Sequence, residues 1–63
     1  MELRFQLADG TACTVQDWYT GRLVRVVREG ILRFYQEIWD APDEVVDAFE
    51  QAVQELEYDG NAE

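Results

Sequence analysis

The chain contains no histidine, serine or lysine, and it has a single cysteine and a single proline. Without His or Ser, a Ser/His/Asp or Cys/His relay cannot be assembled from this chain alone. Cys13 cannot form an internal disulfide, and strand alternation places it in the core, where a thiol is inert. Glycine-rich phosphate loops and calcium-loop spacings are also absent from the sequence. These absences argue against an enzyme, and we expect neither a cofactor nor a metal site.

Negative charge is abundant in one segment. Residues 37–59 hold nine acidic residues and no basic one, whereas all five arginines lie between residues 4 and 33. The formal net charge is −9. Direct binding to nucleic acid or to a membrane surface needs a basic stripe, so we expect neither partner. The charge favours a basic protein partner.

The length predicts one small domain, which we place at residues 1–58, followed by a flexible acidic tail at residues 59–63. A chain of this size buries only about 60% of the surface that its unfolded form exposes, so a partner or second copy would help to stabilise it. The sequence lacks a signal-peptide pattern, and no run approaches the ~20 apolar residues of a membrane span. We therefore expect a cytoplasmic protein, in the host cell if a phage encodes it.

The N-terminal segment predicts a β-hairpin, because apolar and polar residues alternate on both sides of residues 8–10. A two-residue Asp-Gly turn would divide the apolar side chains between two faces. A three-residue loop with Gly10 in the left-handed conformation would keep them on one face. The predicted pairs are Leu7 with Thr11, Phe5 with Cys13 and Leu3 with Val15.

Residues 16–39 allow two interpretations. On a helical wheel most apolar residues share one side and the arginines share the other, which indicates a helix. Gly21, Gly30 and the β-branched residues within 24–27 argue for two strands instead, at residues 22–28 and 31–38, joined at Glu29-Gly30. We favour the helix because the arginines keep a helical period.

From Pro42 onward the sequence predicts an amphipathic helix, since apolar residues recur every three or four positions. Asp40 can cap its first turn, and Pro42 suits the first positions of a helix. Like-charge neighbours on its polar side destabilise it by roughly 0.2–0.5 kcal/mol each, and no Lys offsets them. The expected fold is α+β, a hairpin followed by two antiparallel helices (ββαα). The alternative is a four-stranded antiparallel meander with one C-terminal helix.

The acidic residues of this segment are the candidate partner-binding residues, together with one tryptophan that falls off the apolar sector of the predicted middle helix. They are Glu37, Trp39, Asp40, Asp43, Glu44, Asp47, Glu50, Glu55 and Glu57.

The helix carboxylates Asp43, Glu44, Asp47, Glu50, Glu55 and Glu57, on one face of a very small Lys-free chain, resemble the carboxylate arrays of phage-encoded DNA-mimic inhibitors, including small anti-CRISPR proteins. The resemblance covers residues 37–59 and rests on charge layout. It implies a non-enzymatic inhibitor that occupies the nucleic-acid groove of a basic protein, such as a CRISPR effector subunit, with carboxylates standing where phosphates would be.

The arginines of residues 22–33 depart from that pattern, because they could pair with the acidic helix of the same chain or of a second copy. One alternative is therefore a self-associating protein, such as a homodimer, whose charges serve assembly. Another is an antitoxin-like adaptor that neutralises a basic toxin or regulator. A third is that the acidic face serves only solvation.

Overall fold

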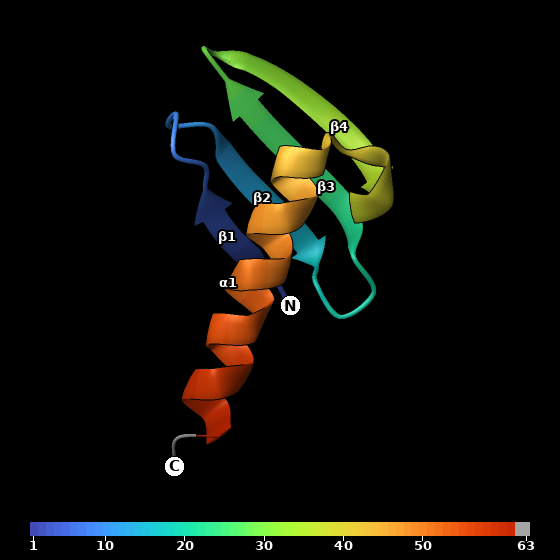
Figure 1. Ribbon diagram of the computed structural model, residues 1–63. Coiled ribbons are helices and arrows are strands. Elements are labelled where there is room, and N and C mark those ends of the chain that lie inside the picture. The colour runs from blue at the N-terminus through green and yellow to red at the C-terminus, as the bar shows by residue number, and fades with distance from the viewer. Residues whose placement is uncertain (62–63) are drawn as a thin grey trace.

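The chain folds into one antiparallel sheet with a helix across one face. The computed structural model describes the backbone of residues 1–61 and the side chains of residues 1–56. In order, the elements are β1 (Leu3–Gln6), β2 (Ala12–Asp17), β3 (Arg22–Arg28), β4 (Ile31–Glu37), the short 3-10 helix η1 (Ile38–Asp40) and α1 (Asp43–Asn61). The strands lie in sequence order, β1-β2-β3-β4, and each pairs antiparallel with the next (Figure 1).

The prediction of a helix over the middle of the chain is wrong, and the alternative meander with one C-terminal helix is the observed fold. Residues 22–28 and 31–37 are strands joined by a two-residue turn. Its residues, Glu29 and Gly30, have φ angles of 52° and 78°. Positive φ at both central positions is typical of the type I′ turn, whose twist matches that of paired strands.

The N-terminal hairpin has the predicted register. Leu3 pairs with Val15 and Phe5 with Cys13. The backbone N–H of Leu7 donates to the carbonyl oxygen of Thr11 at 2.9 Å. Gly10 has a φ of 92°, as the three-residue loop requires. The expected three-residue loop is therefore confirmed.

The core lies between the inner face of the sheet and α1, which crosses this face obliquely and extends beyond it (Figure 1). Phe5 of β1 packs against Phe49 of α1, with ring centroids 6.2 Å apart. Beyond the sheet, α1 has less to cover it, and Leu56 is 42% exposed. The buried apolar residues come from β2, β3, η1, the turn after η1, and α1. They are Cys13, Val15, Val24, Val26, Ile38, Ala41, Val45 and Phe49.

Helix α1 begins one residue after Pro42, whose carbonyl oxygen accepts hydrogen bonds from the N–H groups of Val45 and Val46. Asp40 is the last residue of η1 and therefore does not occupy the expected capping position. The helix continues through Asn61. The flexible tail expected at residues 59–63 stays a prediction, because residues 62 and 63 lie outside the described chain.

Gly21 fixes the place where η1 meets the sheet. Its carbonyl oxygen accepts a hydrogen bond of 2.7 Å from the N–H of Ile38, and its φ is 72°. A Cβ atom at residue 21 would lie 2.9 Å from Cγ2 of Ile38, which is closer than van der Waals contact between two carbon atoms allows. We expect Gly21→Ala to lower the free energy of unfolding by about 1–2 kcal/mol for the left-handed backbone, and further for the displaced Ile38.

Gly10→Ala is the matched control for this prediction. Gly10 also has positive φ, but nothing lies within 4 Å of the position its Cβ would take. Urea unfolding followed by circular dichroism should therefore show a larger loss for Gly21→Ala than for Gly10→Ala. Equal losses would mean that the contact with Ile38 contributes nothing.

Candidate protein-binding surface

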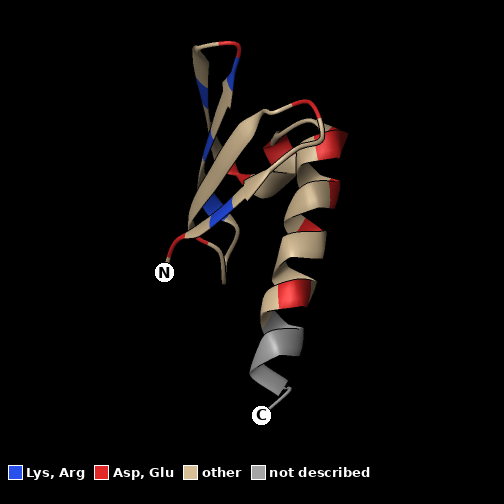
Figure 2. Ribbon diagram, turned by 90° about the vertical axis from the view of Figure 1, so that its left-hand side faces the viewer, with Lys and Arg blue, Asp and Glu red and all other residues tan. Residues whose placement is uncertain are grey.

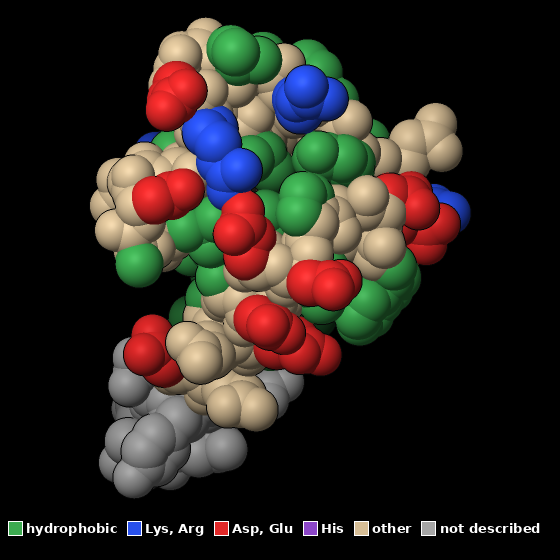
Figure 3. Space-filling model, turned by 45° about the horizontal axis from the view of Figure 1, so that its top comes forward, with side chains coloured by type: hydrophobic (Ala, Val, Ile, Leu, Met, Phe, Trp, Pro, Cys, Tyr) green, Lys and Arg blue, Asp and Glu red, His purple; other side chains and the backbone are tan. Residues whose placement is uncertain are grey.

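The acidic side of α1 faces away from the sheet. The apolar stripe through Val45 and Phe49 is buried, which turns the carboxylates on the other side of the helix toward solvent. Figure 3 shows acidic side chains following one another along this side of the molecule. We call this the acidic helix face and define it by five exposed residues: Asp43, Glu44, Asp47, Glu50 and Glu55.

The other predicted site residues lie on different elements. Glu37 ends β4, where it is the cross-strand partner of Arg22, and Asp40 ends η1. Both are exposed, but neither belongs to the helix. Trp39, also in η1, is 65% exposed. The side chain of Glu57 lies outside the described residues. The structure therefore places six of the nine predicted residues on α1, five of them with described side chains, and the other three on β4 and η1 just before it.

Arg28 ties the start of the acidic helix face to the sheet. Its guanidinium forms an ion pair with Glu44 of α1, and its Nε donates to Oγ1 of the buried Thr11 at 3.0 Å. The same Nε lies 3.6 Å from Oδ2 of Asp9. One end of β3, the β1–β2 loop and the first turn of α1 are thus held together. Long-range contacts of this kind leave no local signal, and the sequence analysis missed this network.

Asp9 also organises the β1–β2 loop. Its Oδ1 accepts a hydrogen bond of 2.9 Å from the backbone N–H of Thr11. Hydrogen bonding from Thr11, aided by the positive charge of Arg28, holds the pKa of Asp9 below its ordinary value. A group whose pKa is lowered by folding stabilises the fold above its unfolded pKa, and that stabilisation is lost as the pH falls through the folded pKa.

We therefore expect the unfolding midpoint in urea to fall when the pH is lowered from 6 to below ~4, the ordinary aspartate range. In Asp9→Asn this part of the pH dependence should be smaller, because the side chain can no longer lose a charge. Glu2→Gln is the control, since among the described residues Glu2 pairs only with its exposed neighbour Arg4, at 3.1 Å. If Asp9→Asn keeps the full wild-type slope, Asp9 is not the group responsible.

The Arg residues lie on the sheet, away from most of the helix carboxylates. Figure 2 shows Arg residues in blue on the strands and acidic residues in red along the helix. The outer face of the four strands, which α1 does not cover, carries Arg4 and Arg25 and no carboxylate. The guanidinium of Arg25 lies 5.6 Å from the ring centroid of exposed Phe34. The molecule is therefore polarised, with an acidic helix opposite a weakly basic sheet face.

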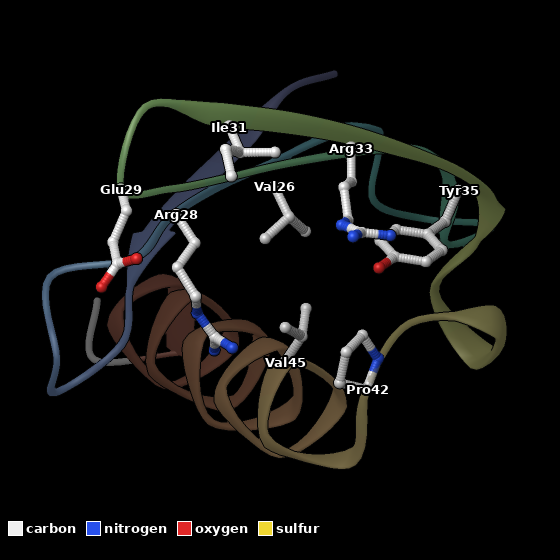
Figure 4. Close-up of a pocket in the computed structure, with 8 residues that line it drawn as sticks. All are labelled: Val26, Arg28, Glu29, Ile31, Arg33, Tyr35, Pro42 and Val45. Atoms are coloured by element: carbon white, nitrogen blue, oxygen red, sulfur yellow. The ribbon is translucent and has the colours of Figure 1, made fainter.

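A cavity of about 370 Å³ opens between the β3–β4 hairpin and the start of α1 (Figure 4). Val26 and Val45 form its apolar part. Arg33 and Tyr35 point into it side by side from β4, opposite Pro42. The helical interpretation of β4 could not place these two side chains together.

A second cavity, of about 480 Å³, lies beside the acidic helix face and is lined in part by Trp39, a predicted contact residue. Trp18 and Tyr19, stacked with ring centroids 4.1 Å apart, line it together with Glu50. Nε1 of Trp18 is buried and has no hydrogen-bond partner in the part of the chain that the structure describes. Aromatic side chains thus adjoin the carboxylates at Glu50.

The thiol of Cys13 and the carboxylates are the groups that catalysis or metal binding would use. Cys13 is 1% exposed, and burial raises the pKa of its thiol. Within the described chain, no group of three His, Cys, Asp or Glu side chains is arranged to hold a metal ion. No helix of the described residues is long and apolar enough to cross a membrane.

Comparison with family models, curated proteins and solved structures finds no match to this chain.

Proposed function

We propose that the protein is a non-enzymatic binding protein whose acidic helix face contacts the basic, nucleic-acid-binding surface of another protein and blocks it. One observation carries this proposal. Of the five exposed carboxylates of that face, only Glu44 has an ion pair with an arginine among the described residues. The other four present unneutralised charge of one sign.

The geometry of α1 suits the contact with a surface that binds phosphates. Neighbouring carboxylates on one helix face lie roughly 5–6 Å apart, and phosphates follow one another along a DNA strand with about 3.4 Å of axial rise. An Arg or Lys side chain that reaches a phosphate can also reach a carboxylate, because both accept charge-assisted hydrogen bonds. A CRISPR effector subunit is one class of partner that would present such a surface.

The uneven distribution of charge would orient the protein as it approaches a basic surface. Because the outer sheet face carries Arg4 and Arg25 and no carboxylate, a basic surface attracts the helix side of the protein more strongly than the outer sheet face. Such attraction accelerates association and weakens as salt is added. Trp18, Tyr19 and Trp39, beside Glu50, could add apolar contact at the edge of the same surface.

The proposal is tested by capture from a host lysate at low salt, with the protein immobilised through its N-terminus, followed by elution with duplex DNA. We expect a basic nucleic-acid-binding protein to be retained and then released by DNA at constant ionic strength. Purified target should in turn lose DNA binding when the protein is added. Retention that DNA does not reverse would contradict blocking of a nucleic-acid site, and failure to retain any basic protein would contradict the proposal as a whole.

A further inference from the structure

Strand β4 is a long edge of the sheet with apolar side chains open to solvent. The other edge, β1, has four residues, whereas β4 has seven and contains neither proline nor lysine. Its apolar side chains are open to solvent: Ile31 is 60% exposed, Leu32 47% and Phe34 67%. Short length, proline, charged side chains or a cover normally prevents an edge strand from pairing with another chain. Strand β4 has two charges, Arg33 and Glu37, and they are opposite in sign.

The β3–β4 turn determines which backbone groups of β4 face outward. Because the turn has two residues, the pair that closes it, Arg28 and Ile31, exchanges hydrogen bonds within the hairpin. Hydrogen-bonded and non-hydrogen-bonded pairs alternate along antiparallel strands. Ile31, Arg33 and Tyr35 therefore bond to β3. The N–H and C=O groups of Leu32 and Phe34 point to the open edge.

We propose that a second copy of this chain pairs antiparallel with β4 along this edge, with Phe34 on the twofold axis. This register joins the outward-facing backbone groups of Phe34 in the two copies. The resulting cross-strand pairs are Phe34 with Phe34, Arg33 with Tyr35, Leu32 with Gln36, and Ile31 with Glu37.

Overlap selects this register, because Phe34 is the middle residue of β4 and an axis there pairs all seven residues of the strand with a second copy. In the proposed register no like charges are directly opposite, and Arg33 of one copy lies diagonally between Glu37 and Arg33 of the other. A slip of the axis to Arg33 would place two arginines opposite each other, which is destabilising. The charges of β4 are therefore compatible with a second copy, and most of α1 lies nearer β1 than β4 (Figure 1).

Edge pairing would form one eight-stranded sheet with both α1 helices on the same side, because the twofold axis runs perpendicular to the sheet. The contact is mostly backbone, and its area is at the low end for specific interfaces, so the dimer should be weak and concentration-dependent. This inference does not rest on the proposed function. It does imply that a dimer would present two acidic helix faces in the same direction.

Two substitutions, each of which adds one cysteine on β4 to the buried Cys13, test the register. In a hydrogen-bonded antiparallel pair the Cα atoms are about 5.5 Å apart, within the range that a disulfide bridges. Phe34→Cys should therefore form a disulfide-linked dimer under mild oxidation at least ~10-fold faster than Leu32→Cys, because the two Leu32 positions would be offset by four residues each, roughly 13 Å apart. A mixture of Leu32→Cys and Gln36→Cys should give the heterodimer preferentially.

Equal rates for Phe34→Cys and Leu32→Cys would overturn the register. Sedimentation equilibrium of the wild type up to millimolar concentration tests the dimer itself, and a monomer throughout would overturn the proposal. Phe34→Pro removes an edge N–H but no β3–β4 hydrogen bond, so it should fold, as judged by circular dichroism, and remain monomeric. Neutralising Asp47, Glu50 and Glu55 should leave the cross-linking rate unchanged, which separates this inference from the proposed function.

Discussion

Replacing Ile38 by alanine is expected to remove a large share of the free energy of unfolding at 25 °C. Ile38 is fully buried between the sheet and α1, and its backbone is bonded to Gly21. Truncation of a buried Ile, Leu or Met to Ala costs about 2–5 kcal/mol. A domain of this size has only ~3–9 kcal/mol of stability in total. The loss therefore takes a major share of what holds the chain folded.

Urea unfolding followed by circular dichroism gives the size of this loss. Leu32→Ala is the matched control, because Leu32 is 47% exposed on the outer sheet face and its truncation should change the stability by no more than about 0.5 kcal/mol. If the two substitutions lower the midpoint equally, Ile38 does not have the central place in the core that its burial indicates.

Neutralising three residues of the acidic helix face should abolish binding while making the protein more stable. The triple variant Asp47→Asn, Glu50→Gln and Glu55→Gln changes the net charge from −9 to −6. It removes like-charge neighbours on α1, each worth roughly 0.2–0.5 kcal/mol, so the free energy of unfolding should rise by up to about 1 kcal/mol. Affinity for the captured basic protein should fall on the order of 100-fold or more, because each exposed carboxylate is expected to meet a cation there.

The matched control carries the same charge change elsewhere. Glu2→Gln, Asp17→Asn and Glu29→Gln also gives −6, but none of these residues lies on α1. Isothermal titration calorimetry against the captured protein should show nearly wild-type affinity for this control. A comparable loss of affinity in both variants would mean that only net charge matters and that the helix face has no particular role.

The hairpin and the C-terminal helix could be predicted because their signals are local. Alternation around Gly10 specified the register of β1 and β2, and the three-to-four spacing from Val45 onward specified α1. Both patterns admit only one secondary structure, since the alternative would divide the apolar side chains between two faces.

The middle of the chain was ambiguous because its arginines fit both periods. Arg22, Arg25 and Arg28 are three apart, as on one side of a helix, yet in the sheet Arg25 faces outward and the other two inward. The turn also depends on Glu29 at a φ of 52°, which a non-glycine residue seldom adopts. Pairing with β2, a tertiary effect, decides in favour of strands.

The candidate surface was predictable in part because helical spacing is a local signal. Residues of one helix face can be grouped from spacing alone, so the five acidic helix positions were identified together. Contacts between distant segments cannot be predicted in this way, and the pairing of Glu44 with Arg28 emerges only from the folded sheet. Arg33 and Tyr35, two residues apart, share a side only because β4 is a strand. Glu37 and Asp40 were near the helix in sequence, but the turn at η1 places them on other elements.

The central claim is that the acidic helix face is the contact surface, and it is tested most directly by two-dimensional NMR of the ¹⁵N-labelled protein with and without the captured basic protein. We predict that the largest losses or shifts of amide signals fall on α1 between residues 43 and 55, with Trp39 affected at the margin. Changes confined to the outer sheet face, around Arg25 and Phe34, would contradict the account.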